Sequence, residues 1–254
     1  MAVTDWYGGQ PYATWPWARA ALGDAKPKVL KNDDGFQFLE IAKLKPDLIV
    51  GPNAGMESDD YAKLTKIAPT IPHAKAGAAW FSPWPEMLAP IAQAVGKAAE
   101  GERVKAAVQQ KFADAATANP GFAGKKAIFL QNAVYDGNLI AYQKGLSTEF
   151  LTDLGFAIPA EIDPFVKEGE QAYIPVEKIS VLNAADVLVW GTEKDSDRVA
   201  LEKVPGFASL TAVQAGRSVY TSGELAGAIY FASPLSLPFV VDQLVPMLAG
   251  ALKG

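Results

Sequence analysis

Two similar helix-to-strand units lie in opposite halves of this 254-residue chain. In the first unit, apolar residues between positions 36 and 44 have helical spacing, Pro46 ends the helix, and residues 47–51 predict a buried parallel strand. In the second unit, a segment that begins at Ile174 leads into residues 186–191, which predict another buried strand. The pair indicates two α/β lobes of similar build, although any α/β protein carries several units of this kind.

A long helical region separates the two units, from about residue 84 to residue 119. Within it, Val104, Val108 and Phe112 recur on one face of an amphipathic helix, whereas charged residues between them are available to water. This helix would span ~25 Å at 1.5 Å per residue, and the sequence Asn-Pro-Gly that starts at position 119 ends it. We expect a stiff connection between the lobes.

The second lobe is predicted to open with a strand at residues 127–130 and to include a strand at residues 217–221. Its last segment has a helical pattern, in which Pro238 and Pro246 should kink or break the helix. We therefore predict an α/β protein of two Rossmann-like lobes. The predicted domains are a first lobe at 1–101, an interlobe helix at 102–119, and a second lobe with a C-terminal helix at 120–254.

Composition excludes several classes of function. The net charge of -5 and the lack of a basic patch argue against a nucleic-acid partner, because phosphate binding depends on clustered lysine and arginine. The absence of cysteine excludes thiolate metal sites and disulfides. The single histidine, His73, cannot build a multi-histidine zinc site, and its loop predicts a solvated surface residue. No apolar run is long enough to span a membrane.

Catalytic patterns are also missing. Residues 121–125 have the wrong glycine spacing for a phosphate-binding loop, and Ser147 follows no strand and has no nearby base. Adjacent acids such as Asp33 and Asp34 are typical of solvated turns. We expect no catalytic residues, no bound metal and no intrinsic cofactor.

Large aromatic residues gather at predicted strand ends and in loops of both halves. In open α/β sheets, ligands bind beyond the carboxyl ends of the strands, where such side chains offer wide apolar contact and a few polar groups. Any one of them could equally anchor a loop in the core. Their presence in both halves predicts a ligand cleft between the lobes. The aromatic candidates are Trp6, Tyr7, Trp80, Tyr135, Trp190 and Tyr230.

Several segments, in order and spacing, resemble a known family along the whole chain. They are 2–8, 10–12, 15–17, 44–50, 61–70, 149–155, 182–190 and 233–238. The chain resembles the iron-siderophore-binding proteins of ABC importers, and among them the actinobacterial, including mycobacterial, members. This is the periplasmic-binding-protein class whose two lobes are joined by one rigid helix.

The resemblance implies that the protein captures a ferric siderophore and delivers it to the permease of an ABC transporter. It adds Asn53 and Asn132 as hydrogen-bonding ligand contacts beside the six aromatic candidates. It also implies that Glu57 and Glu177 dock on arginines of the permease. Both acids equally suit the positive ends of the helices that follow them.

Members of this family carry an export signal, a lipid-anchoring cysteine and a full strand-helix unit before the position that matches Ala2. We therefore expect an extracytoplasmic, lipid-anchored natural form and an N-terminally truncated chain here. A missing first strand would expose a sheet edge, so we expect a monomer that could pair through this edge.

The nature of the ligand is left open between three readings. Arg19, Arg103, Arg198 and Arg217 are the only arginines, and none follows a predicted strand, which favours a hydroxamate or mycobactin-like chelate over an anionic triscatecholate or citrate complex. A haem or corrinoid could occupy the same fold, with His73 as a poor axial ligand. An enzyme on a doubly wound α/β scaffold is the third reading.

Overall fold

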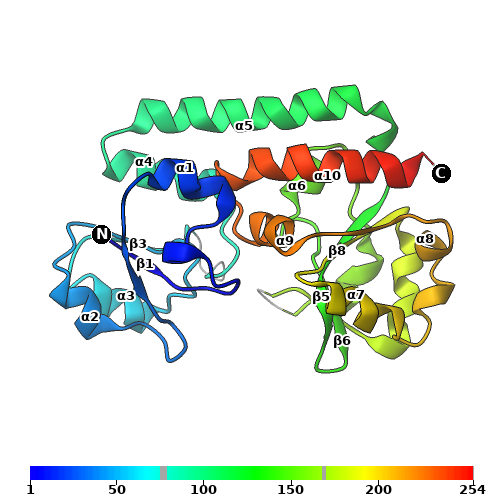
Figure 1. Cartoon of the computed structure of the whole chain (residues 1–254), viewed down its shortest axis with the longest axis horizontal. Coiled ribbons are helices and arrows are strands. Elements are labelled where there is room, and N and C mark those ends of the chain that lie inside the picture. Colours follow the sequence, from blue (N-terminus) through cyan, green and yellow to red (C-terminus); the bar gives the residue numbers. More distant parts are fainter. Residues whose placement is uncertain (75–78, 168–169, 254) are drawn as a thin grey trace. The chain divides into compact units, whose positions relative to one another are not determined.

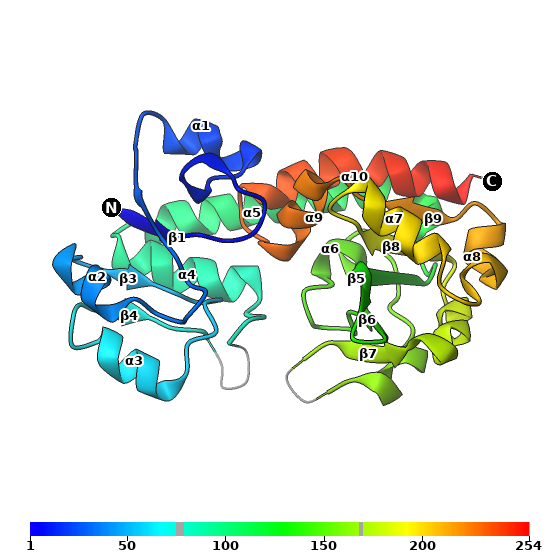
Figure 2. The same cartoon turned by 60° about the horizontal axis from the view of Figure 1, so that its bottom comes forward.

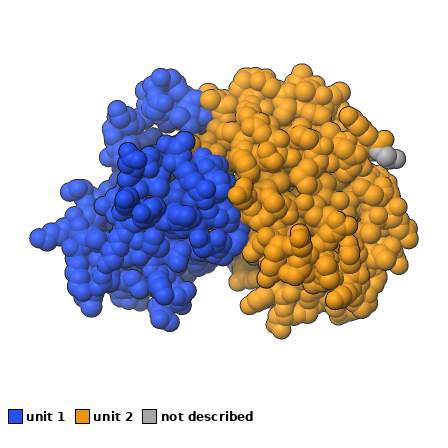
Figure 3. All heavy atoms as spheres, viewed as in Figure 1, with its two compact units in different colours: residues 1–105 blue, residues 106–254 orange. Residues whose placement is uncertain are grey.

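The computed structural model describes residues 1–74, 79–167 and 170–253, and it divides into two compact units, residues 1–105 and 106–254 (Figure 3). The boundary falls inside the longest described helix, α5 (Ala98–Ala118). The predicted amphipathic helix is therefore present and begins a turn earlier than expected. None of the described helices is both long enough and apolar enough to cross a membrane.

The N-terminal unit contains two small parallel sheets (Figure 1). Strand β1 (Ala2–Thr4) pairs with β2 (Lys28–Leu30), and β3 (Ile49–Val50) pairs with β4 (Thr70–Ile71). The accompanying helices are α1 (Arg19–Leu22), α2 (Phe38–Lys43), α3 (Ser58–Leu64) and α4 (Trp84–Ala94).

The buried strand predicted at residues 47–51 is only partly present. Its paired part is limited to the two residues of β3, and Val50 is 47% exposed. Buried parallel strands usually lie inside a larger sheet that is covered on both faces, whereas β3 pairs only with β4 among the described strands. The best-buried large side chains near it, Met56 and Leu64, come instead from the loop after β3 and from α3.

The C-terminal unit is built on a mixed five-stranded sheet of order β7-β6-β5-β8-β9 (Figure 2). Strand β5 runs parallel to β8, which runs parallel to β9, whereas β6 and β7 continue the sheet in antiparallel pairs. The strands are β5 (Ala127–Tyr135), β6 (Asn138–Ala141), β7 (Ala172–Pro175), β8 (Val187–Gly191) and β9 (Ser218–Tyr220).

Side-chain alternation along β5 separates the two faces of this sheet. Ile128 and Leu130 enter a large apolar cluster together with Leu188 and Trp190 of β8. Phe129 points to the other face, where its ring contacts other aromatic rings. The helices of this unit are α6 (Glu149–Thr152), α7 (Asp195–Glu202), α8 (Thr211–Gln214), α9 (Gly223–Tyr230) and α10 (Ser236–Leu252).

The predicted apolar face of α5 is confirmed in the part that belongs to this unit. Val108 and Phe112 are 4% and 3% exposed. Lys111 forms an ion pair of 2.7 Å with Asp242 of α10, and both side chains remain partly exposed. The ion pair and the apolar stripe together attach α5 to α10, which lies beside it in this unit.

Two prolines do not interrupt α10, contrary to expectation. The helix is continuous from Ser236 to Leu252. Pro238 lies in the first turn, where a backbone N–H would have no partner within the helix, so its ring costs little there. Pro246 lies in the interior, and the contacts of α10 with α9 and β9 offset the cost of this proline.

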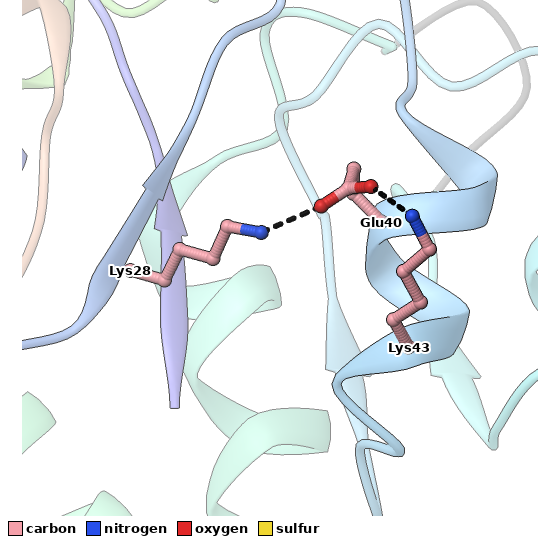
Figure 4. A network of polar contacts seen from close by, with 3 residues as sticks. All are labelled: Lys28, Glu40 and Lys43. Atoms are coloured by element: carbon pink, nitrogen blue, oxygen red, sulfur yellow. Dashed lines mark hydrogen bonds and ion pairs between the residues drawn. The ribbon is translucent and has the colours of Figure 1, made fainter.

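A network of three charged side chains links β2 to α2 in the N-terminal unit (Figure 4). The Glu40 carboxylate accepts hydrogen bonds from the Nζ atoms of Lys28 and Lys43, both at 2.6 Å. The hydrogen bond from Lys28, followed by that from Lys43, lowers the pKa of Glu40 from 4.5 to about 2. A lowered pKa means that the charged carboxylate is favoured in the folded state.

We expect Glu40→Gln to lower the urea midpoint of unfolding at neutral pH. Because the folded-state pKa is depressed, this contribution is fully present above pH 4.5 and is lost as the pH falls through about 2. The difference between the variant and the parent should therefore shrink across that window. Glu102→Gln, at an exposed carboxylate, is the control. A difference that does not change with pH would contradict the assignment.

Candidate functional site

Two exposed tryptophans face each other in the N-terminal unit. Trp6 follows β1, and Trp80 comes from the segment before α4. Their ring centroids lie 5.9 Å apart with an interplanar angle of 49°. They are 44% and 48% exposed, so a large part of both rings remains available for contact with a ligand. Two of the predicted ligand residues are thus brought together.

The loop after β3 holds the segment that carries Trp80. The backbone N–H of Gly55 donates to the carbonyl of Ala79 at 2.9 Å. The backbone N–H of Ser82 donates to Oδ1 of Asn53 at 2.7 Å, and Oγ of Ser82 donates to the carbonyl of Pro52 at 2.8 Å. Asn53, predicted to bind the ligand, therefore already uses its side-chain oxygen within the protein.

Tyr7 belongs to a separate aromatic cluster in the same unit. Its ring meets the edge of Trp15 at 5.3 Å, and Trp15 stacks on Trp17 at 5.1 Å. Trp15 is only 8% exposed, so the cluster anchors the loop that follows β1. Tyr7 thereby supports the backbone next to Trp6.

In the C-terminal unit, the predicted residues occupy different positions along the sheet. Tyr230, at the end of α9, donates its hydroxyl to the carbonyl of Gly191 at 2.8 Å, and its ring contacts Phe129. Tyr135 is 70% exposed at the end of β5. Asn132 has a left-handed backbone with φ of 53° and lies where the register between β5 and β6 shifts.

Trp190 does not lie at a surface. It is 0% exposed and packs against Phe207 within the apolar cluster of the C-terminal unit, at a centroid distance of 5.4 Å. The prediction that its side chain faces a ligand does not fit this burial. The reason is the parity of β8, which points residue 190 to the same face as Leu188, into the core.

Sequence reasoning missed a polar cluster in the middle of β5, at the last residue that pairs with β8. Gln131 accepts hydrogen bonds from the hydroxyl of Tyr142 at 2.8 Å and from Nε2 of Gln171 at 3.2 Å. Burial raises the pKa of Tyr142 to about 12, so the phenol stays protonated. The sequence did contain a sign of this cluster. Gln131 is the first polar residue after an apolar run, and it lies two residues after Phe129, so both side chains point to the same face of the strand.

A cavity of about 450 Å³ lies elsewhere in the C-terminal unit, between β9 and the last turns of α10. Arg198 lines it and lies over the ring of Tyr220 at 4.6 Å. None of the residues predicted to bind a ligand lines this cavity, so it does not correspond to the predicted site.

The charged candidates lie at the surface. Glu57 precedes α3, and its backbone N–H donates to the carboxylate of Asp60 at 3.3 Å; Glu177 lies in a 3-10 turn after β7. Both side chains are exposed. His73 is partly buried, which differs from the solvated position that we predicted. Among residues 1–74, 79–167 and 170–253, no group of three or more His, Cys, Asp or Glu residues could hold a metal ion.

Comparison with known proteins gives a consistent result. The sequence model of a family described as "Periplasmic binding protein" matches residues 2–225. A comparison with curated proteins finds no match.

Solved structures resemble the whole chain. A periplasmic solute binding protein from Mycobacterium smegmatis is 46% identical, with a TM-score of 0.91 over 99% of this chain and 85% of that chain. PiaA from Streptococcus pneumoniae in complex with ferrichrome is 26% identical, with a TM-score of 0.79 over 95% of this chain and 82% of that one. FhuD2 from Staphylococcus aureus with bound ferrioxamine B shares the fold, with 18% identity and a TM-score of 0.70 over 89% and 84% of the two chains.

Core and surface tryptophans should respond differently to truncation. We expect Trp190→Ala to destabilise the C-terminal unit by about 3–5 kcal/mol, because it leaves a large cavity beside Phe207. Trp80→Ala should change the free energy of unfolding by less than ~1 kcal/mol, since its ring is nearly half exposed. Urea unfolding followed by far-UV circular dichroism measures both. Equal losses in the two variants would refute the distinction.

Proposed function

The chain belongs to the periplasmic binding protein family, the non-enzymatic substrate-binding proteins of ABC importers, and we propose that its ligand is a ferric siderophore of low charge. Membership of this family implies an extracytoplasmic protein with a small-molecule ligand and a transporter partner. A lipid anchor on the natural form is part of the proposal.

The single observation that best supports a siderophore is the exposed pair Trp6 and Trp80. Exposed tryptophans leave apolar surface in water, and a bound ligand would remove that surface while contacting rigid rings with few rotatable bonds. A hydroxamate siderophore offers a bulky, partly apolar chelate for this contact. PiaA, at 26% identity, was crystallised with such a ligand, ferrichrome.

The interactions of the arginine side chains support a ligand of low charge. Arg103 pairs with Glu100, and Arg198 forms an ion pair of 2.9 Å with Glu202. Arg217 faces Asp186 at 4.0 Å. The remaining one, Arg19, donates to Oε1 of Gln10 at 2.9 Å. Three of the four guanidinium groups thus have a carboxylate partner, which would weaken their attraction for an anionic ligand.

The C-terminal unit also has a cluster of uncharged polar side chains at the middle of β5. Gln131, Tyr142 and Gln171 form one hydrogen-bonded cluster there, and Tyr142 is kept protonated by burial. Amide and phenol groups suit a neutral chelate, because they solvate hydroxamate and amide oxygens without a charge of their own.

We expect tight binding of ferrichrome and of ferrioxamine B, and binding of a triscatecholate iron complex that is weaker by about a hundredfold. Titration of tryptophan fluorescence measures all three, and Trp80→Ala should weaken ferrichrome binding by about tenfold. Trp190→Phe, which changes only the core, is the matched control. Tight binding of the triscatecholate alone would overturn the proposal.

Docking on the permease is proposed for Glu57 and Glu177, one exposed acid from each unit. The double variant Glu57→Ala and Glu177→Ala should lose importer-dependent iron uptake in cells and keep its affinity for ferrichrome. Glu102→Ala, at another exposed acid, should leave uptake unchanged. Normal uptake by the double variant would show that these acids do not dock.

A further inference from the structure

The position of the Trp80 ring depends on the absence of a side chain at Gly55. A Cβ atom at Gly55 would lie 1.9 Å from Cζ2, 2.3 Å from Cε2 and 2.4 Å from Cη2 of Trp80. All three atoms belong to the six-membered part of the indole, so the ring lies directly against the backbone of residue 55. No side chain larger than hydrogen fits there unless the indole moves.

Gly55 also has a backbone conformation that other residues rarely adopt. Its φ is 63°, in the left-handed region, where a Cβ atom is disfavoured. In this conformation its N–H reaches the carbonyl of Ala79, the residue before Trp80. The same glycine therefore fixes the backbone before the tryptophan and provides the surface on which its ring rests.

Asn53 fixes the backbone on the other side of the tryptophan. Its side-chain oxygen accepts the N–H of Ser82, two residues after Trp80, at 2.7 Å. The hydroxyl of Ser82 donates to Pro52, so the attachment has two hydrogen bonds. Trp80 is thus held between two attachment points, both of which lead to one loop.

The loop itself has a firm base. The N–H of Gly51 donates to the carbonyl of Ile71 in β4 at 2.9 Å, and Met56 at the far end is 1% exposed. Between these two points the loop can move little without breaking buried contacts. The indole of Trp80 packs against this loop and is therefore held in place, although nearly half of its own surface faces solvent.

We propose that Gly55 and Asn53 are positioning residues, which hold Trp80 opposite Trp6 and so preform the aromatic ligand-contacting wall of the N-terminal unit. The part of this proposal that concerns the ligand rests on the proposed function, whereas the part that concerns the position of Trp80 does not. A preformed wall raises affinity because the ring loses less conformational freedom when a ligand arrives. Asn53 then acts through Trp80 and does not need to touch the ligand.

The test of Gly55 uses near-UV circular dichroism of the whole chain without ligand. Trp80→Ala defines the spectrum without this indole. Gly55→Ala should shift the spectrum most of the way to that of Trp80→Ala, because the new methyl group displaces the ring. Gly96→Ala is the matched control, since Gly96 has a φ of 68° in the same unit but open space around its Cβ position. A parent-like spectrum for Gly55→Ala would overturn the proposal.

Ferrichrome titration provides the second readout. Gly55→Ala should weaken binding about tenfold, as Trp80→Ala does, and Gly96→Ala should not. In the Trp80→Ala background, Gly55→Ala should weaken binding no further, because the ring that it displaces is already absent. Additive losses would mean that Gly55 acts by another route and would overturn the proposal.

Asn53 is tested by two substitutions. Asn53→Ala removes the acceptor for Ser82 and should change the spectrum, whereas Asn53→Asp keeps an oxygen at that position and should restore both the spectrum and the binding. Loss of binding in Asn53→Asp with a parent-like spectrum would show that Asn53 contacts the ligand directly, against the proposal. If the parent protein binds neither ferrichrome nor ferrioxamine B, the proposed function fails, and the spectra without ligand still decide the positioning role.

Discussion

The parallel pairing of β5 with β8 is the contact on which the C-terminal unit depends. Five residue pairs in register join two strands whose paired residues are almost all fully buried. Once this register is set, alternation decides which face of the sheet each side chain of the paired stretch points to. Trp190 then lies in the apolar core, whereas Phe129 and Gln131 point to the opposite face. The same pairing brings Gly191, the last residue of β8, opposite Gln131 of β5.

The N-terminal unit positions its aromatic side chains in a different way. Its strands are two or three residues long, so ladders of hydrogen bonds supply little rigidity. Loops take over that role through specific contacts. The loop from Gly51 to Met56 is anchored at both ends and holds Trp80, and the cluster around Trp15 supports the backbone next to Trp6. A binding surface made of loops can be as well defined as one made of strands when its polar backbone groups are satisfied.

The elements with strong periodic patterns were predictable from sequence. The helix around Val108 and Phe112 and the strand at 187–191 are present where their patterns place them. The strand around Val50 was overestimated, because an apolar run does not reveal how many neighbours the strand will have. The prolines of α10 led us to predict a kinked or broken helix, but the helix is continuous. Packing against α9 and β9 outweighs the backbone penalty of Pro246. Gln131 was overlooked because a lone polar residue after an apolar run is informative only when its hydrogen-bonding partners are known.

The sequence by itself predicted an α/β protein of two lobes, resembled a family of binding proteins, and pointed to the aromatic residues at strand ends. These conclusions depend on composition, periodicity and order along the chain, which are local or additive properties. Only the tertiary structure decided which aromatic side chains are exposed. Trp80 and Trp190 both follow or end an apolar segment, yet one is 48% exposed and the other 0%. The physical reason is that exposure depends on the parity of a strand and on contacts from distant loops, such as that between Gly55 and Trp80, which no local pattern records.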